Sequence, residues 1–271
     1  MNFQDKGIRR FAKAHACGND FLIVEGECDR ELAIRLCARN TGVGADGVEF
    51  LEWTGEREGR IRLVNADGSI AEISGNGTRC VAAWMAHQKH VPVGESIVLE
   101  TDAGRRECRL VHTNGHRFEF AAGMGVPAIE DKQITLTDGT KVAGVAVSTG
   151  NPHFVIFVEG GSFHAHGRAW QVLGYEICSH GDFPDETNVE FVHLIDTNKI
   201  EIRIFERGVG PTRSSGTGTC ATAAATIARR GGYSHLLVRA PGGEQQIDWS
   251  GEGFEIALTG PAELICVGEA W

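Results

Sequence analysis

A five-residue motif of small and polar residues occurs twice in this chain of 271 residues. The motif S-G-N-G-T stands at 74–78 and S-G-T-G-T at 215–219. Each copy runs directly into an apolar, helix-like segment, so each is a loop that feeds the start of a helix. A chain built around such a repeat has to place two similar loop–helix units in its fold.

Two further pairs of matching segments precede the repeated motif in the same order. A Gly-Asn pair at 18–19 and another at 150–151 each lead into a short apolar, strand-like run. A polar residue ends a strand-like run nine positions before each S-G-x-G-T motif, Asn65 in the first copy and Glu206 in the second. Three ordered matches argue against chance, so we interpret the chain as one unit of about 130 residues used twice.

Hydrophobic periodicity predicts an α+β fold in which strands outnumber helices. Helix-like runs lie at 30–39, 77–89, 165–177 and 216–230. Strand-like runs lie at 21–25, 47–52, 60–65, 96–101, 107–112, 116–121, 133–137, 142–148, 154–158, 189–195, 199–206, 235–239, 245–249, 253–258 and 263–267. The two helices after the repeated motif are apolar nearly all round, which is typical of buried helices. We therefore expect two pseudo-symmetric lobes, each a curved mixed sheet wrapped around a buried central helix.

The boundary between the lobes is expected in the Gly- and Pro-containing segment 121–128. This places the N-terminal lobe at 1–121, joined by a C-terminal strand at 261–271, and the C-terminal lobe at 122–260.

Charge and cysteine usage limit the classes of partner. The chain has 26 Lys and Arg against 36 Asp and Glu and no basic run, which argues against nucleic acid. No apolar stretch reaches the ~18 residues that span a bilayer, so no membrane partner is expected, and no export signal follows the basic residues near the start. The eight cysteines are scattered without a C-x-x-C pair, so we expect no metal site, no disulfides and reduced thiols in the cytoplasm.

A glycine-rich turn at a helix start exposes backbone N–H groups and the positive end of the helix dipole, so it binds anions. The simpler interpretation is that Ser74 and Ser215 are only N-caps. Two such loops in two similar lobes favour one small-molecule site in a cleft. Inversion of a stereocentre needs this arrangement, because one group removes a proton from one face and another delivers a proton to the opposite face.

The motifs of this chain, taken together, resemble those of diaminopimelate epimerase over residues 11 to about 268. The matching segments are H-A-C-G-N-D-F at 15–21, G-V-G-A-D-G at 42–47, N-A-D-G-S at 65–69, S-G-N-G-T-R-C at 74–80, G-N-P-H at 150–153, E-R-G at 206–208 and S-G-T-G at 215–218. The resemblance implies an isomerase of bacterial lysine biosynthesis that interconverts LL- and meso-diaminopimelate without a cofactor such as pyridoxal phosphate. It also implies a small-molecule amino-acid substrate and a homodimer.

The resemblance assigns roles residue by residue. The side chains that would bind the two amino-acid ends of the substrate are Asn19, Asn65, Asn151, Asn188, Glu206 and Arg207. The backbone N–H groups that would meet the reacting carboxylate belong to Gly75, Asn76, Gly216 and Thr217. His153 and Glu206 resemble the pair that tunes the acid and base. Structural roles stay open beside these: turns for Asn65 and Asn188, a core position for His153, and a solvated pair for Glu206 and Arg207.

The main departure from the family is that its acid and base are cysteines, at the positions of Ser74 and Ser215. A thiol is a far stronger acid than an unactivated hydroxyl, so forming an alkoxide costs about 10 kcal/mol more than forming a thiolate. Cys80 and Cys220 lie inside the helices and are expected to be packing residues. A second departure is Gly47, where the family commonly has a side-chain amide. The Ser/Ser form is therefore expected to be weakly active or inactive.

Several alternatives remain at this point. Two origins of the serines are open: the family's two cysteines were replaced deliberately, to trap a complex or prevent oxidation, or the natural sequence has serine at both sites and uses a different acid and base. Three functions are open as well: an epimerase of diaminopimelate, a related isomerase of the proline-racemase or phenazine-biosynthesis type, and a non-catalytic amino-acid-binding protein.

Overall fold

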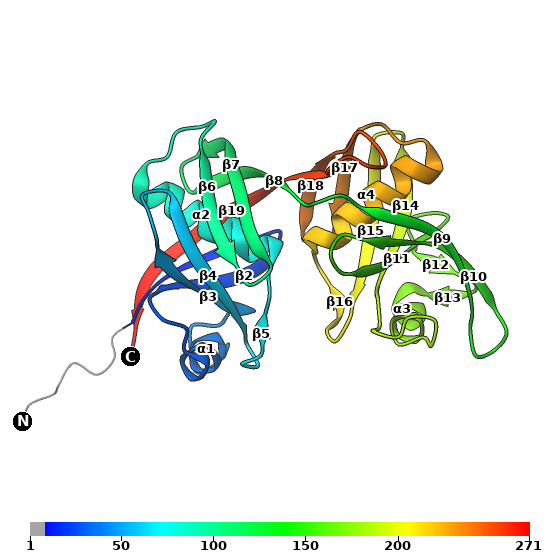
Figure 1. Ribbon diagram of the computed structural model, residues 1–271. Coiled ribbons are helices and arrows are strands. Elements are labelled where there is room, and N and C mark those ends of the chain that lie inside the picture. Colours follow the sequence, from blue (N-terminus) through cyan, green and yellow to red (C-terminus); the bar gives the residue numbers. More distant parts are fainter. Residues whose placement is uncertain (1–8) are drawn as a thin grey trace, which may run out of the picture. The chain divides into compact units, whose positions relative to one another are not determined.

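The computed structural model describes residues 9–271 of the chain (Figure 1). These residues form two compact units, which we call the N-terminal and the C-terminal lobe. The N-terminal lobe extends to Ala122 and takes in Gly260–Trp271, and the C-terminal lobe is Gly123–Thr259. No helix in the described part of the chain is both long enough and apolar enough to span a bilayer.

The N-terminal lobe is a single mixed sheet with two helices. Its helices are α1 (Arg30–Cys37) and α2 (Gly75–Lys89). Its strands are β1 (Arg9–Ala16), β2 (Asn19–Glu25), β3 (Gly47–Trp53), β4 (Glu58–Asn65), β5 (Ile70–Ala71), β6 (Ser96–Thr101), β7 (Gly104–Asn114), β8 (Arg117–Gly123) and the C-terminal part of β19 (Ala257–Ala270). The strand order is β19-β1-β2-β3-β4-β6-β7-β8, and β8 pairs back onto β19, so the sheet closes on itself.

The C-terminal lobe repeats this arrangement. Its helices are α3 (Trp170–Cys178) and α4 (Gly216–Arg230). Its strands are β9 (Ala128–Thr135), β10 (Lys141–Ser148), β11 (Pro152–Phe157), β12 (His164–Ala165), β13 (Arg168–Ala169), β14 (Asn188–Asp196), β15 (Lys199–Glu206), β16 (Gly210–Thr212), β17 (His235–Ala240), β18 (Gly243–Asp248) and the start of β19. The strand order is β9-β10-β11-β14-β15-β17-β18-β19.

The two lobes also share the directions of their strand pairs. The parallel pairs are β2–β3 and β4–β6 in the N-terminal lobe, and β11–β14 and β15–β17 stand at the corresponding places in the C-terminal lobe. The neighbouring pairs in both sheets are antiparallel. The internal duplication seen in the sequence is therefore a duplication of topology.

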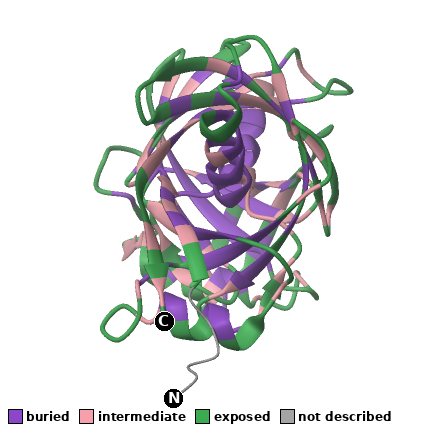
Figure 2. Ribbon diagram, turned by 90° about the vertical axis from the view of Figure 1, so that its left-hand side faces the viewer, coloured by how far each residue is buried: buried purple, intermediate pink, exposed green. Residues whose placement is uncertain are grey.

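Each sheet wraps around one helix that is buried along most of its length. In the N-terminal lobe, α2 packs its Ala and Val side chains against β1, β6, β7 and β8, and Figure 2 shows a buried helix inside the ring of strands. In the C-terminal lobe, α4 is buried from Thr219 to Thr226 among strands of both edges of the sheet. Small residues let a sheet approach a helix on all sides, which is why these helices are rich in alanine.

The two shorter helices cover the outside of the sheets. Helix α1 contributes Leu32 and Leu36 to a second core with β2, β3 and β4. Helix α3 contributes Leu173 and Ile177 to the equivalent core of the C-terminal lobe. Each of these helices forms the crossover between two parallel strands, as right-handed crossover geometry requires.

Some of the predicted element bounds are wrong. The helix expected at 165–177 begins only at Trp170, because Gly167 and His166 have positive φ and form the turn of the β12–β13 hairpin. Most of the strand expected at 253–258 is absent, and β19 begins at Ala257. Strand β1 was not expected. Its buried face consists of Ala12, Ala14 and Ala16, and alanine gives only a weak strand signal.

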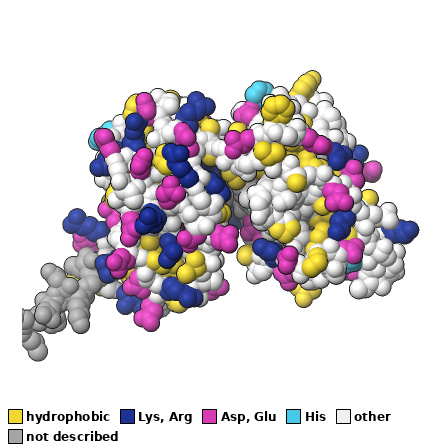
Figure 3. All heavy atoms as spheres, viewed as in Figure 1, with side chains coloured by type: hydrophobic (Ala, Val, Ile, Leu, Met, Phe, Trp, Pro, Cys, Tyr) yellow, Lys and Arg dark blue, Asp and Glu magenta, His cyan; other side chains and the backbone are white. Residues whose placement is uncertain are grey.

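Two of the cysteines lie inside the central helices. Cys80 and Cys220 are fully buried there, as expected. All eight cysteines lie in the described part of the chain, and none of them forms a disulfide. On the face of the molecule in Figure 3, basic and acidic side chains are interspersed and neither sign gathers into a broad patch.

Enclosure of α4 predicts that its alanines do not tolerate larger side chains. Ala224 is fully buried, whereas Ala228 on the same helix is only partly buried. We expect Ala224→Leu to lower the free energy of unfolding by about 1–3 kcal/mol, because the extra atoms have to displace strands. Ala228→Leu is the matched control and should cost clearly less. Urea-induced unfolding of both variants measures this, and equal losses would contradict an enclosed helix.

Candidate functional site

The repeated motif of the N-terminal lobe is the capped start of α2. Ser74 is the N-cap residue, in extended backbone conformation, and its Oγ accepts a hydrogen bond of 3.1 Å from the N–H of Gly77. Thr78 Oγ1 donates to the carbonyl oxygen of Ser74 at 2.8 Å. A capped helix has no intrahelical acceptor for its first N–H groups, so this end of α2 is suited to an anion.

The motif of the C-terminal lobe has the same geometry at α4. Ser215 Oγ accepts a hydrogen bond of 3.3 Å from the N–H of Gly218, and Thr219 Oγ1 donates to the Ser215 carbonyl at 2.7 Å. Ser215 is buried and Ser74 is half-buried. Both serines therefore act as N-caps, which is the simpler of the two interpretations of the motif. Capping occupies an acceptor site of each hydroxyl, and the hydroxyl of Ser215 also hydrogen-bonds to the carboxyl group of Glu206.

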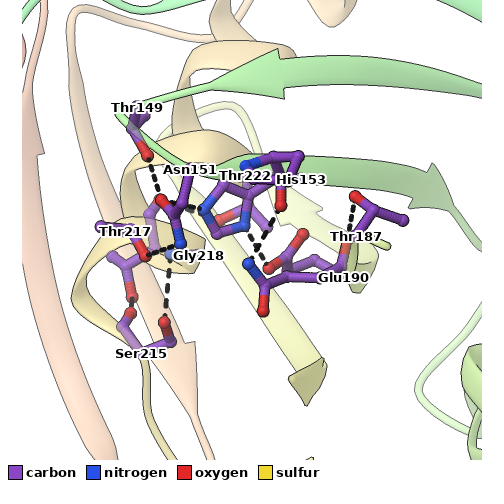
Figure 4. A network of polar contacts seen from close by, with 12 residues as sticks. Thr149, Asn151, His153, Thr187, Glu190, Ser215, Thr217, Gly218 and Thr222 are labelled. Atoms are coloured by element: carbon purple, nitrogen blue, oxygen red, sulfur yellow. Dashed lines mark hydrogen bonds and ion pairs between the residues drawn. The ribbon is translucent and has the colours of Figure 1, made fainter. Parts of the chain in front are cut away.

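An asparagine from the Gly-Asn pair contacts each capped helix start. Asn76 Nδ2 donates to Asn19 Oδ1 at 3.2 Å in the N-terminal lobe. Asn151 Nδ2 donates to Thr217 Oγ1 at 3.4 Å in the C-terminal lobe (Figure 4). The structure thus brings together two of the matched segments in each lobe, and in both cases the contact is to the second residue after the serine.

In the N-terminal lobe, Asn19 and Asn76 have different further partners. Asn19 Nδ2 donates to Asp46 Oδ2 at 2.7 Å, and Asp46 forms an ion pair of 2.7 Å with Arg39. On the other side, Arg79 Nη2 donates to Asn76 Oδ1 at 2.6 Å. The start of α2 therefore lies in a network of charged and amide side chains. Two residues of this network were not singled out from the sequence: Asp46, which is exposed, and Arg79, which is 2% exposed.

In the C-terminal lobe, the asparagine leads into a buried His–Glu pair. Asn151 Oδ1 lies 3.0 Å from His153 Nε2, and His153 Nδ1 lies 2.7 Å from Glu190 Oε1. The side chains of His153 and Glu190 are both fully buried, and Figure 4 shows the contact between them. A carboxylate on one ring nitrogen fixes the orientation of the imidazole, so Glu190 positions His153 beside Asn151.

A buried glutamate lies under each helix start, and neither was identified from the sequence. Glu49 on β3 is 1% exposed and Glu190 on β14 is fully buried. A Cβ on Gly77 would overlap with Glu49 Oε1, and a Cβ on Gly218 would stand 2.8 Å from Glu190 Oε1. Only glycine leaves room for these carboxyl groups. The signal that reveals them is a fourth repeat, V-E-F at 48–50 and at 189–191, with a charged residue inside an apolar strand.

The pKa values of the buried carboxyl groups are shifted by their surroundings. Burial raises the pKa of Glu49 from 4.5 to about 8. Burial also raises the pKa of Glu206, and the hydroxyl of Ser215, which hydrogen-bonds to this carboxyl group, opposes the shift. Glu206 therefore lies beside the serine that stands at one family acid–base position.

Three more of the predicted ligands, Asn65, Asn188 and Arg207, have structural partners in the described residues. Asn65 Nδ2 donates to Ser69 Oγ at 3.0 Å within a turn. Asn188 Nδ2 donates to the Pro152 carbonyl at 2.9 Å, and its Oδ1 accepts from the backbone N–H of Arg207 at 3.0 Å. Arg207 Nη1 donates to the carbonyl of Asp185 at 2.7 Å, on an exposed side chain. The side chain of Asn188 thus fixes the position of the backbone at Arg207.

The glycine at position 47 is explained by packing. A Cβ there would stand 3.0 Å from both Leu63 Cδ1 and the Val64 carbonyl of the neighbouring strand β4. A side-chain amide at this position would require that strand to shift. Across residues 9–271, no group of three or more His, Cys, Asp and Glu side chains is arranged to hold a metal ion.

Comparisons with known proteins identify the family to which this chain belongs. The diaminopimelate epimerase family profile matches residues 11–129 and 145–265. The diaminopimelate epimerase of Moorella thermoacetica is 33% identical over 278 residues, covering 96% of this chain and 98% of that protein. That of Desulforudis audaxviator is 36% identical over 283 residues, with 96% and 98% covered. That of Corynebacterium glutamicum strain R is 35% identical over 273 residues, with 96% and 97% covered.

Solved structures share the fold at low sequence identity. A PhzF-family phenazine biosynthesis protein of Bacillus anthracis matches with a TM-score of 0.73 and 16% identity, covering 98% of this chain and 99% of that one. A hydroxyproline epimerase of Agrobacterium vitis matches with a TM-score of 0.73 and 16% identity, covering 99% and 94%. The expected fold class and family resemblance are thereby confirmed.

The buried carboxyl group of Glu49 predicts a pH-dependent stability. The folded protein holds a proton that the unfolded chain releases above its ordinary pKa of 4.5, so stability falls as the pH rises from there to about 8. Glu49→Gln removes this ionisation. We expect the variant to be more stable than the parent by a few kcal/mol at pH 9, at about 1.4 kcal/mol per pKa unit, and equal to it at pH 4.

Urea-induced unfolding at a series of pH values measures this difference. Glu52→Gln is the matched control, because Glu52 lies on the same strand but is exposed, and it should follow the parent. A constant difference between Glu49→Gln and the parent over the whole pH range would contradict the assignment.

Proposed function

Since this chain belongs to the diaminopimelate epimerase family, we propose that it binds diaminopimelate in the manner of a cofactor-independent epimerase that interconverts the LL and meso isomers for lysine biosynthesis. The observation that carries the proposal is the capped helix start that occurs once in each lobe. Each start has a serine N-cap and an asparagine bonded to the second residue after it. Both features recur at equivalent places of a duplicated fold.

Two helix starts suit the central difficulty of the reaction. Removing an α-proton places negative charge on the carbon and its carboxylate, and this charge needs preorganised N–H donors. In the proposed complex, the N–H groups of Gly75, Asn76, Gly216 and Thr217 serve this carboxylate. One lobe acts on each face of the α-carbon, as inversion requires.

The remaining ligands suit the zwitterionic ends of the substrate. Arg207 would bind the distal carboxylate, preferably through a bidentate pair of hydrogen bonds. This requires its guanidinium to leave the Asp185 carbonyl, which an exposed side chain can do at low cost. The carboxyl group of Glu206 and the amide groups of Asn65, Asn151 and Asn188 would accept hydrogen bonds from the ammonium groups.

The serines are expected to slow the chemistry and not the binding. A hydroxyl at position 74 or 215 is a far weaker acid than a thiol, by about 10 kcal/mol in the cost of the anion. The helix dipole offsets no more than about 2 kcal/mol of this. Cys80 and Cys220 do not replace the missing thiols, since both are fully buried inside the helices, and burial raises the pKa of Cys80.

Two other functions compete with this one. A related isomerase would prefer another substrate, and a binding protein would hold an amino acid without turnover. Glu206 and Arg207 next to Asn188 favour a substrate with amino-acid groups at both ends. Calorimetry with LL-, meso- and DD-diaminopimelate, proline and glutamate distinguishes the proposed function from a related isomerase, because the proposed function requires tightest binding of a diaminopimelate isomer. A measurement of turnover distinguishes it from a binding protein.

Restoring the thiols should restore turnover. In heavy water, we expect the parent to take up deuterium at the α-carbon extremely slowly, although it binds the substrate. The double variant Ser74→Cys, Ser215→Cys should epimerise diaminopimelate, whereas either single variant should at most exchange the proton on one face with little inversion. Mass spectrometry and stereoisomer analysis of the four proteins measure this.

Ser214→Cys supplies a control, because it adds a thiol one residue away from the N-cap position. It should behave as the parent does. Fast epimerisation by the parent would overturn the role given to the two serines. A double variant that binds diaminopimelate but stays inactive would favour the binding protein.

A further inference from the structure

Glu49 is a buried carboxyl group without a partner. It lies in the middle of β3, beside Ile23 of β2 and Leu63 of β4, which are apolar. Its side chain is 1% exposed, and neither carboxyl oxygen has a hydrogen-bond partner. Burying a polar group without a hydrogen bond lowers the free energy of unfolding, so the position of Glu49 needs a functional or structural explanation.

The carboxyl group of Glu49 is directed at the start of α2. A Cβ on Gly77 would overlap with Glu49 Oε1 and would stand 3.3 Å from Ser74 Cβ. Glu49 therefore lies against the turn whose N–H groups are suited to an anion. In the C-terminal lobe, Glu190 lies in the same way beneath Gly218 but is bonded to His153.

The lobes differ because Phe21 stands where the C-terminal lobe has His153. Phe21 pairs with Gly47 on β3, as His153 pairs with Asn188 on β14. Phenylalanine offers no hydrogen bond, so Glu49 has no counterpart to the buried imidazole. The two helix starts are alike in their backbone, and they differ in whether the carboxyl group beneath them has a side-chain hydrogen-bond partner.

The charged and titratable groups near Glu49 are engaged elsewhere. Arg79 on α2 donates to Asn76 and to the Pro261 carbonyl. Asp20 on β2 is paired with Lys13 of β1 and with Arg39. The buried thiol of Cys80 on α2 is a further neighbour, and like Glu49 it is driven to its neutral form by burial. Burial is accordingly what sets the pKa of Glu49, which is raised to about 8.

We propose that the start of α2 is a proton-coupled carboxylate site, in which a ligand carboxylate binds only while Glu49 holds its proton. An ionised Glu49 would place a second negative charge at the same helix turn in a medium of low dielectric constant, where like charges repel strongly. A neutral Glu49 leaves the positive end of the helix dipole to the ligand. By linkage, a bound carboxylate then raises the affinity of Glu49 for its proton. The identity of the ligand as diaminopimelate rests on the proposed function, whereas the coupling itself does not.

The coupling is measured on the parent protein by carbon-13 NMR of the Glu49 carboxyl group, assigned with Glu49→Gln. The probes are diaminopimelate, pimelate, glutamate and acetate, each titrated from pH 5 to pH 10. We expect a binding carboxylate to raise the Glu49 pKa by one unit or more. Calorimetry at pH 8 in two buffers of different ionisation enthalpy should show that binding takes up protons.

The affinity gives the second readout. With a pKa of about 8, the affinity of the parent for the probe should fall about tenfold between pH 6 and pH 9. In Glu49→Gln, the affinity for the same probe should fall less than twofold over this pH range. Glu52→Gln, on the exposed face of β3, should keep the tenfold loss.

The proposal is overturned if no probe shifts the Glu49 pKa, or if Glu49→Gln keeps the full pH dependence. If pimelate or acetate couples to Glu49 while diaminopimelate does not bind, the proton-coupled site stands and the proposed substrate is wrong. If diaminopimelate binds with no change in the Glu49 pKa, the proposed substrate stands and the proton-coupled site is wrong.

Discussion

Enclosing a helix inside a sheet is the constraint on which the rest of this structure depends. Such a helix has to be narrow on its buried sides, so α4 consists mostly of alanine, glycine and threonine, and α2 places Gly77, Thr78, Cys80, Ala82, Ala83 and Ala86 at buried positions. Its first N–H groups are removed from bulk water and need acceptors. A serine N-cap satisfies one of them in each lobe, and the others form a place for an anion. The residues of S-G-x-G-T thus follow from the burial of a helix start, and the proposed chemistry would use the N–H groups of that start.

The third position of each helix links packing to electrostatics. Gly77 and Gly218 leave the space that a buried glutamate fills. Duplication preserved this arrangement in both lobes, but the partner of the glutamate differs. Glu190 is paired with His153, whereas Phe21 stands at the position of His153 in the N-terminal lobe and Glu49 has no hydrogen-bond partner. The two helix starts of this pseudo-symmetric fold therefore differ in the partner of the buried glutamate.

The sequence was most informative where backbone geometry dictates residue type. The S-G-x-G-T repeats predicted both buried helices, because capping and close packing permit few alternatives. Strand β1 was missed because its buried residues are alanines, and the start of α3 was misplaced because Gly167 forms a hairpin turn. Asn65 and Asn188 have turn and backbone partners that no sequence pattern distinguishes from ligand roles. Glu49 and Glu190 were missed because a single charged residue in an apolar strand usually points to solvent, and only the fold shows that these two point inward.

The central proposal is that the starts of α2 and α4 bind the same ligand. Backbone amide NMR of the parent protein during a titration with meso-diaminopimelate tests it most directly, because slow chemistry leaves the complex intact. The account predicts that the amide resonances of residues 75–77 and of residues 216–218 shift together, with one dissociation constant and one ligand per chain. Shifts confined to one helix start, or two different dissociation constants, would contradict it.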